Sequence, residues 1–227
     1  MSEPLNAEEI AALRAFSTPT VCNAVETFNV RPWSEGFMDG TIGCRFPELG
    51  PMVGYAVTAK MRAASKPQTQ VPFGEVWDEF EKTQRPWVVV VEDLDRPKPV
   101  GSFWGEVNAS VYKRLGAVGC VTNGGVRDLG DVRPHGFHFF SSCLLVSHAY
   151  LHVVEAGTPV SVGGLTVRPG DLLHGDEARR DVRAARDRAR LARGVRQDRG
   201  GGACADRLCG VSGVDGGGAA GMYGRVD

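Results

Sequence analysis

A strand–helix–strand unit constrains the fold of this chain more than any other stretch. The apolar run Trp87–Val91 is typical of a buried strand. A loop with small residues at its ends, Gly101–Gly105, leads into a run with apolar residues at helical spacing, which Gly116 ends. A second apolar strand follows over Ala117–Thr122. Strands that alternate with a helix in this way predict an α/β domain.

Polar residues gather at the loops of this unit. Asn123-Gly124-Gly125 is a strong turn signal directly after the second strand. Arg127 and Asp128 follow it, and Asp131 stands one helical turn further along. We therefore expect a turn at residues 123–125 and a group of charged side chains just beyond it.

These residues suit the binding of a small oxo-acid. A glycine loop that leads into a helix at Gly105 leaves backbone N–H groups without partners at the positive end of the helix dipole, which favours an anion. Arg127 can bind a carboxylate through two parallel hydrogen bonds. Asp128, adjacent in sequence but directed elsewhere, offers oxygen to a divalent cation such as Mg²⁺. Glu106 stands in the first turn of the helix, close to the same anion site.

The same residues have a purely structural interpretation. Arg127 and Asp128 can form a surface ion pair at a helix start, and Glu106 can be an acid that complements the helix dipole. On spacing alone, this structural interpretation is the more common outcome.

The order of these charged residues resembles a known signature. Glu106, followed after twenty residues by Arg127-Asp128, resembles the acidic-X20-Arg-Asp signature of the 4-hydroxy-4-methyl-2-oxoglutarate aldolases. These are class II, metal-dependent pyruvate aldolases that share a fold with the regulator of ribonuclease E activity A (RraA). The resemblance covers roughly Ser17 to Glu177. Further segments also resemble that family: Trp104–Glu106, Val121–Val126, Pro159–Leu165, Arg168–Asp171 and His174–Asp176.

The resemblance implies the layered β/β/α fold of that family, of the swivelling-domain type. It implies a single RraA-like domain over residues 1–177, followed here by an irregular C-terminal tail over residues 178–227. It also implies a homotrimer or a dimer of trimers, with sites between subunits. The central strands are expected near residues 54–60, 87–91, 117–122, 137–141 and 159–167.

The resemblance further implies a lyase that uses a divalent cation, Mg²⁺ or Mn²⁺. Its substrate would be 4-hydroxy-4-methyl-2-oxoglutarate or a similar small 2-oxo acid, with oxaloacetate decarboxylation as a side reaction. Both reactions pass through a pyruvate enolate. By resemblance, Arg127 binds the carboxylate and keto oxygen of the substrate, Asp128 holds the metal, and Glu106 orients or deprotonates a water on it. The substrate rests on the helix start, formed by Gly105, Glu106, Val107 and Asn108.

The alternative function is that of a non-enzymatic binding protein that regulates an RNA-degrading enzyme, as in the sister branch of the family. That branch is expected to lack the complete acidic-X20-Arg-Asp set. This chain retains the set, so the enzyme is favoured.

Composition and charge indicate a cytoplasmic protein that binds neither nucleic acid nor membranes. The net charge is −1, which gives no overall attraction to nucleic acid or acidic lipids. No run of about 18 apolar residues is present. The acidic, amphipathic N-terminus lacks the basic-then-apolar order of a signal peptide. Six cysteines are scattered without the paired spacing of a zinc site, so free thiols are expected.

Local patterns predict further elements. Asn6 and Glu9 have the spacing of a capping box for a helix over residues 6–15, and Ser17 with Pro19 starts a second helix. Residues 160–167 indicate a hairpin with a Gly-Gly turn. An apolar stripe at helical spacing is interpreted as core and consists of Phe73, Val76, Trp77 and Phe80.

Four other polar residues are weaker candidates for a site. Asp93 and Asp95 follow the first strand at its carboxyl end, where α/β sheets bind ligands, but solvated loop residues are the more common outcome. His148 and His152 are four residues apart in a stretch that alternates like a strand, which places both on one face. No third ligand of a suitable type is near, so a zinc site is not favoured.

The tail from residue 178 differs in composition from the rest of the chain. Eleven arginines and no lysine lie between Arg179 and Arg225. Residues 178–196 have the composition of an arginine-rich helix with almost no apolar face, and residues 197–227 that of a disordered segment. The strand and acidic helix that the resemblance implies here are not recognisable. We interpret the tail as the product of a shifted reading frame, and the alternative is a basic tail that binds nucleic acid.

Overall fold

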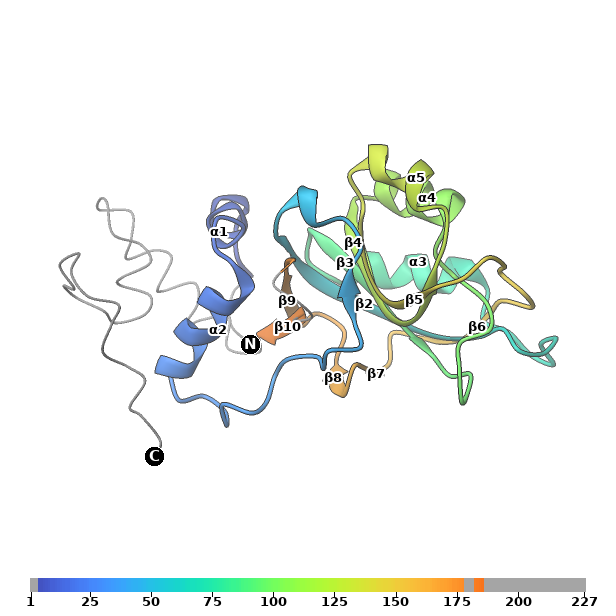
Figure 1. Ribbon diagram of the computed structural model, residues 1–227, viewed down its shortest axis with the longest axis horizontal. Coiled ribbons are helices and arrows are strands. Elements are labelled where there is room, and N and C mark those ends of the chain that lie inside the picture. The colour runs from blue at the N-terminus through green and yellow to red at the C-terminus, as the bar shows by residue number, and fades with distance from the viewer. Residues whose placement is uncertain (1–3, 178–181, 186–227) are drawn as a thin grey trace, which may run out of the picture.

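The computed structural model describes residues 4–177 and 182–185 of the chain. A mixed sheet at its centre consists of β1 (Gly43–Cys44), β2 (Met52–Arg62), β3 (Trp87–Asp93), β4 (Ala117–Val126), β5 (His138–Leu144), β6 (His152–Ala156), β9 (Leu172–Gly175) and β10 (Val182–Ala185). The strand order is β1-β5-β4-β3-β2-β9-β10, and β6 also pairs with β2 (Figure 1). Strands β2, β3, β4 and β5 are parallel neighbours, whereas the other pairs are antiparallel.

Helices and a small second sheet surround this sheet. The second sheet contains β7 (Val160–Val162) and β8 (Leu165–Val167). The helices are α1 (Ala7–Leu13), α2 (Thr18–Thr27), α3 (Phe73–Glu81), α4 (Glu106–Leu115) and the short α5 (Leu129–Val132), with 3₁₀ turns at Pro47–Leu49 and Arg133–His135. Among the residues described, no helix has the length and apolar character needed to cross a membrane. The four cysteines within the described ranges are free thiols, namely Cys22, Cys44, Cys120 and Cys143.

Strand β3 is buried on both faces and separates two cores. Its residues Val89 and Val91 pack in one core with apolar side chains of α3 and α4. Its residues Val88 and Val90 pack in the other core, which β7 and β8 cover. Successive side chains of a strand point to opposite faces, and parallel sheets are usually covered on both. The layers are therefore sheet, sheet and helix, which confirms the predicted β/β/α fold class (Figure 1).

The two predicted N-terminal helices are present, and they pack against one end of the sheet, beside β9 (Figure 1). The capping box is present, since the N–H of Glu9 donates to the Asn6 side chain at 3.0 Å and the N–H of Asn6 donates to the Glu9 carboxylate at 2.9 Å. At the start of α2, the N–H of Thr18 donates to Asp176 at 2.7 Å. The Thr18 hydroxyl lies 2.9 Å from Nδ1 of His174, so buried polar contacts join α2 to β9.

Two predictions about the sheet are wrong. Residues 123–125 do not form a turn but lie inside β4, where the pairing with β5 shifts register between Thr122 and Gly125. Such an irregularity is a bulge, which bends a strand without ending it. The segment near residues 159–167 is not a central strand. It forms the β7–β8 hairpin, and the predicted Gly-Gly turn is confirmed by positive φ angles at Gly163 and Gly164.

The apolar stripe of α3 is only half buried, so its assignment to the core is wrong for two residues. Val76 and Phe80 are 0% and 3% exposed, whereas Phe73 and Trp77 are 40% and 43% exposed. Residues four apart share a row along a helix. The row with Val76 and Phe80 faces the sheet, and the neighbouring row with Phe73 and Trp77 lies at its rim.

Two further predictions differ from the structure. His148 and His152 do not share a strand, because residues 145–151 form loop and turn and β6 begins only at His152. Val182–Ala185 forms β10, antiparallel to β9, where the composition indicates part of an arginine-rich helix. A strand is thus present after residue 177, where none is recognisable in the sequence, and the remaining predictions for residues 178–227 lie outside the described residues.

Gly116→Ala should destabilise the fold. Gly116 ends α4 with a φ of 106°, and its N–H donates to the carbonyl of Lys113 at 3.0 Å. A side chain in this left-handed region should lower the free energy of unfolding by about 1–2 kcal/mol, measured by urea denaturation. The control is Gly130→Ala, since an added Cβ there meets no atom within 4 Å. Equal losses in both variants would contradict the conformational role of Gly116.

Candidate functional site

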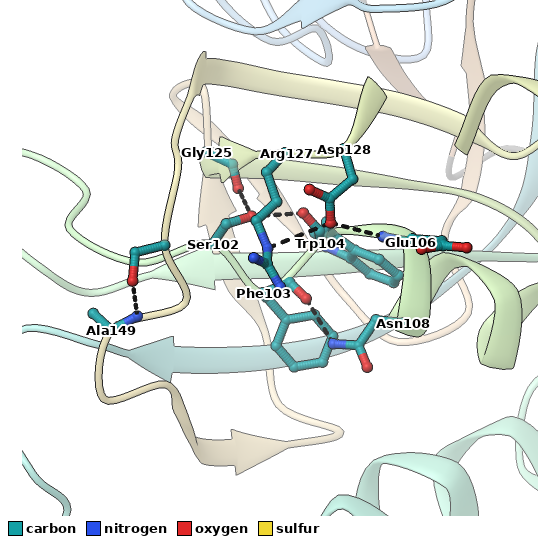
Figure 2. Close-up of polar contacts among 10 residues, drawn as sticks. Ser102, Phe103, Trp104, Glu106, Asn108, Gly125, Arg127, Asp128 and Ala149 are labelled. Atoms are coloured by element: carbon teal, nitrogen blue, oxygen red, sulfur yellow. Dashed lines mark hydrogen bonds and ion pairs between the residues drawn. The ribbon is translucent and has the colours of Figure 1, made fainter. Parts of the chain in front are cut away.

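The candidate site lies where the loop Gly101–Gly105 meets the end of β4 (Figure 2). The N–H of Arg127 donates to the carbonyl of Trp104 at 3.0 Å. The Ser102 hydroxyl, which is buried, shares its hydrogen between the carbonyls of Trp104 at 2.6 Å and Gly125 at 2.8 Å. These contacts join the loop to the strand and fix the point at which α4 begins.

The bulge in β4 is held by both neighbouring strands. The Asn123 side chain accepts a hydrogen bond from the N–H of Asp93 at 2.7 Å and donates one to its carbonyl at 3.0 Å. From the other side, the Ser142 hydroxyl contacts the carbonyls of Asn123 at 2.7 Å and Gly124 at 3.0 Å. Bulges reorient the side chains that come after them and occur beside active sites. The bulge in β4 comes directly before Arg127 and Asp128 and so affects the direction of both side chains.

Arg127 and Asp128 form an ion pair, as the structural interpretation of the sequence predicts, whereas the interpretation as a binding site has Asp128 directed elsewhere. Nε of Arg127 lies 3.5 Å from Oδ2 of Asp128, and both side chains are about one-third exposed. The same oxygen accepts a hydrogen bond from the N–H of Glu106 at 3.2 Å (Figure 2). The anion at the start of α4 is therefore the Asp128 carboxylate, which the helix dipole stabilises. Asp128 has a φ of 57°, a conformation that is uncommon outside glycine and recurs at functional sites.

Gly105 permits the close approach of this pair to the helix. A Cβ at this position would lie 2.5 Å from Oδ2 of Asp128 and 3.1 Å from Cγ and Nε of Arg127. The need for glycine is steric, because the φ of −154° is open to any residue.

Each member of the pair retains groups that the protein does not use. Within the described residues, neither Nη atom of Arg127 takes part in a hydrogen bond or ion pair, and neither does Oδ1 of Asp128 (Figure 2). The first turn of α4 adds the amides of Val107 and Asn108, which have no partner within the helix. A guanidinium and two amides are thus available to a bound anion.

A pocket of about 200 Å³ opens beside Arg127. Sites for drug-sized ligands measure about 300–1,000 Å³, so this pocket suits a smaller molecule. It brings together four predicted site residues, which are Gly105, Val107, Asn108 and Arg127. Five further residues line it, namely Phe73, Ser102, Phe103, His148 and Leu151.

Glu106 and Asp128 lie outside this lining. Their contact through the Glu106 N–H holds them at the rim, and the Glu106 side chain extends away from Arg127 in Figure 2. Glu106 is exposed. The structure thus places its backbone at the anion site but directs its carboxylate outward.

For two of the lining residues, Phe73 and His148, the sequence suggests a role other than lining a pocket. Periodicity assigns Phe73 to the core, because it cannot separate a buried row from a row at a pocket rim. The spacing of His148 suggests only a metal ligand. The contact that brings His148 to the pocket is long-range, since the carbonyl of Ser147 accepts the N–H of Ser102 at 2.9 Å.

The donor groups fit a divalent cation that keeps most of its water. In the part of the chain that the structure describes, no three His, Cys, Asp or Glu side chains are placed to hold a metal ion together. Zinc usually takes three or four such ligands, so the described residues do not fit it. Mg²⁺ takes one or two carboxylates and retains several waters. Oδ1 of Asp128 is available for that role, while the two contacts to Oδ2 hold the carboxylate in place.

Asp93 and Asp95 are buried, not solvated as the sequence pattern suggests. They are 1% and 5% exposed. One oxygen of Asp95 accepts the N–H groups of Ala63 and Ala64 at 2.8 and 2.9 Å, which ties the end of β3 to the chain after β2. Oδ1 of Asp93 accepts the N–H of Asp95 at 2.8 Å, whereas its Oδ2 is buried and has no hydrogen-bond partner among the residues that the structure describes. Burial raises the pKa of Asp93 to about 6.

Comparisons with known proteins identify the family and the fold of the chain. Residues 18–178 match the family described as RraA-like, Aldolase/RraA. A crystal structure described as novel cellulases from microbes associated with the gut ecosystem has a TM-score of 0.72 and 19% identity, over 87% of this chain and 86% of that one. Streptomyces coelicolor RraAS2, described as an unusual member of the RNase ES inhibitor RraA protein family, has a TM-score of 0.64 and 21% identity, over 87% and 94%. At these identities the likeness shows a shared fold.

One curated relative matches a short part of the chain. Protein DlpA of Legionella pneumophila subsp. pneumophila is 28% identical over 78 residues, which are 34% of this chain. The match spans 13% of the length of DlpA.

Asp93→Asn should change how stability depends on pH. The folded protein holds the Asp93 proton up to about pH 6, whereas an unfolded chain releases it near pH 4. The contribution of this group to stability therefore falls as pH rises from about 4 to about 6, by up to about 3 kcal/mol. Asparagine does not titrate, so the stability of the variant relative to the parent should rise by that amount across the window.

Urea unfolding at a series of pH values from about 4 to about 8 measures this difference. A constant difference between variant and parent would show that folding does not raise the pKa of Asp93.

Proposed function

The chain belongs to the RraA-like, Aldolase/RraA family, and we propose that it is a divalent-metal-dependent lyase that acts on small 4-hydroxy-2-oxo acids. The family includes aldolases and decarboxylases as well as ribonuclease inhibitors. The specific proposal is a class II pyruvate aldolase of the 4-hydroxy-4-methyl-2-oxoglutarate type, with oxaloacetate decarboxylation as a second reaction. One observation supports it above the others: Arg127, whose Nη atoms have no partner among the described residues, lines a small pocket at the start of α4.

Arg127 is proposed to bind the 2-oxo acid. Its planar guanidinium can bind a carboxylate through two parallel hydrogen bonds. Cleavage of the bond between C3 and C4 leaves an enolate, whose charge develops on the oxygen at C2. A guanidinium held next to that oxygen stabilises this charge more than it stabilises the neutral ketone, and such preorganised groups usually contribute most to catalysis.

The start of α4 is proposed to complete the anion site. The amides of Val107 and Asn108 lie at the positive end of the helix dipole, and Gly105 lets a ligand approach the backbone closely. The Asn108 side chain donates to the carbonyl of Phe103 at 2.6 Å, which fixes it in the pocket wall. Together these groups hold the substrate with its oxo-acid end toward Arg127.

Asp128 and Glu106 are proposed to act at the rim. Asp128 would hold the cation, Mg²⁺ or Mn²⁺, through Oδ1. When bound, the cation supplies Lewis-acid polarisation of the oxo-acid oxygens. Glu106 is an exposed acid at the same rim, and it would return a proton to the enolate through solvent. Family members are typically oligomers, and we propose a homotrimer or a dimer of trimers.

The pocket favours the enzyme over the alternative, a binding regulator of an RNA-degrading enzyme. A regulator needs a surface that docks on its partner. It does not need a guanidinium with unused donors inside a pocket of about 200 Å³. The likeness to RraAS2 rests on the fold, which both functions share.

Pyruvate release should require a divalent cation held by Asp128. The assay measures pyruvate from 4-hydroxy-4-methyl-2-oxoglutarate and from oxaloacetate, first with chelator and then with Mg²⁺ restored. Mg²⁺ should restore turnover in the parent but not in Asp128→Ala, and calorimetry should show Mg²⁺ binding to the parent alone. Unchanged Mg²⁺ binding in the variant would place the metal elsewhere.

Arg127→Ala should abolish turnover while the fold persists. The side chain makes one weak ion pair and is 32% exposed, so its loss removes little packing. We expect kcat/KM to fall by at least about 10²-fold, the loss typical of one preorganised donor. The matched control is Arg114→Ala, an exposed arginine on α4 outside the pocket, which should keep the activity of the parent. Comparable kcat/KM in all three proteins would remove Arg127 from the site.

A further inference from the structure

We propose that His148 takes the proton from the C4 hydroxyl of the substrate as the carbon–carbon bond breaks, a role that rests on the proposed lyase function. His148 lines the same pocket as Arg127 and Asn108. Among the lining residues in the described part of the chain, His148 and Arg127 are the titratable ones. Arginine does not lose its proton in proteins. Histidine can accept and return one near neutral pH.

Contacts with the loop Gly101–Gly105 hold the main chain of His148 in position. The N–H of Ser102 donates to the carbonyl of Ser147 at 2.9 Å. A Cβ on Gly101 would collide with the carbonyl oxygen of His148, so the two backbones are in close contact. That oxygen also accepts the N–H of Leu151 at 3.2 Å, which closes a turn. The main chain that carries the imidazole is thus fixed against the loop that leads into α4.

One hydrogen bond orients the imidazole of His148, which is exposed. Nδ1 of His148 lies 2.8 Å from the carbonyl oxygen of Ala149. A carbonyl only accepts, so Nδ1 carries the hydrogen and Nε2 of the neutral ring is an acceptor. Ala149 has a φ of 48°, and its N–H donates to the Ser147 hydroxyl at 3.0 Å (Figure 2). A left-handed backbone at a residue other than glycine is held by its surroundings and is common at active sites.

The chemistry of cleavage needs such a base. Nε2 takes the hydrogen of the C4 hydroxyl, and the pair of the broken O–H bond forms the new carbonyl at C4. The C3–C4 bond breaks, its pair forms a C2–C3 double bond, and the former C2 carbonyl becomes an enolate oxygen near Arg127. The enolate then takes a proton at C3, and the imidazolium gives its proton to solvent. No oxidant or reductant is required.

Oxaloacetate offers a test within the same pocket. It has no C4 hydroxyl, and the loss of carbon dioxide from C4 yields the same enolate without removal of a proton. A residue that serves only the hydroxyl is therefore needed for aldol cleavage and not for decarboxylation. A residue that supports the pocket structurally is needed for both.

The experiment compares the two reactions in His148→Ala. We expect kcat for 4-hydroxy-4-methyl-2-oxoglutarate to fall by about 10²–10⁴-fold with little change in KM, and added imidazole to restore part of it. Decarboxylation of oxaloacetate should stay within about threefold of the parent. The control is His135→Gln, an exposed histidine that contacts Ser110 outside the pocket, and it should keep both activities.

Each outcome bears on the proposal. Equal losses in both reactions, or no loss in either, would overturn the role of His148 while leaving the lyase in place. A parent without either reaction overturns the proposed function and the role of His148 together.

Long-range ¹H–¹⁵N NMR of the parent supplies a measurement that does not depend on turnover. It should show the neutral ring of His148 with hydrogen on Nδ1, and hydrogen on Nε2 would also overturn the proposal.

Discussion

Burial of the parallel strands on both faces is the constraint on which the rest of the structure depends. Alternate valines of β3 lie in two different cores, so helices must cover one face and the β7–β8 hairpin the other. A sheet covered on both faces leaves polar groups exposed mainly where its strands end. In α/β sheets, ligands bind at the carboxyl ends of the strands. The bulge in β4, the buried Asp93 and the pair of Arg127 and Asp128 all lie there.

The sequence predicts those features that nearby residues determine. Helix α4 runs from Glu106 to Leu115 as the sequence predicts, because both signals, Gly105 and Gly116, directly flank it. The Asn123–Gly125 turn signal fails because distant groups decide the outcome, namely the backbone of Asp93 and the hydroxyl of Ser142 on the neighbouring strands. The same distinction between local and distant determinants applies to the site. A short motif places the guanidinium beside the helix start, but only the folded chain brings His148 and Phe73 to the same pocket.

The structural and chemical interpretations of the charged pair prove to be compatible. Asp128 is both the acid that complements the start of α4 and the proposed metal ligand, because its two oxygens have different surroundings. Oδ2 has two contacts with the protein, and Oδ1 has none among the described residues. The nitrogens of Arg127 differ in the same way. Nε contacts Asp128, and neither Nη atom has a partner among the described residues. The contacts within the pair hold both side chains in place and leave the remaining atoms without partners among the described residues.

The bulge also restricts how this chain can change over evolution. The residues between Glu106 and Arg127 are the rest of α4, Gly116 and the ten residues of β4, and both ends of the segment are tied to the same loop. One residue inserted in the helix would rotate its remaining turns by about 100°, and one inserted in the strand would move every later side chain to the opposite face. Substitutions can accumulate in this segment, but insertions and deletions cannot. Length variation among descendants should instead gather in the exposed stretch over residues 64–70, which is free of that geometric linkage.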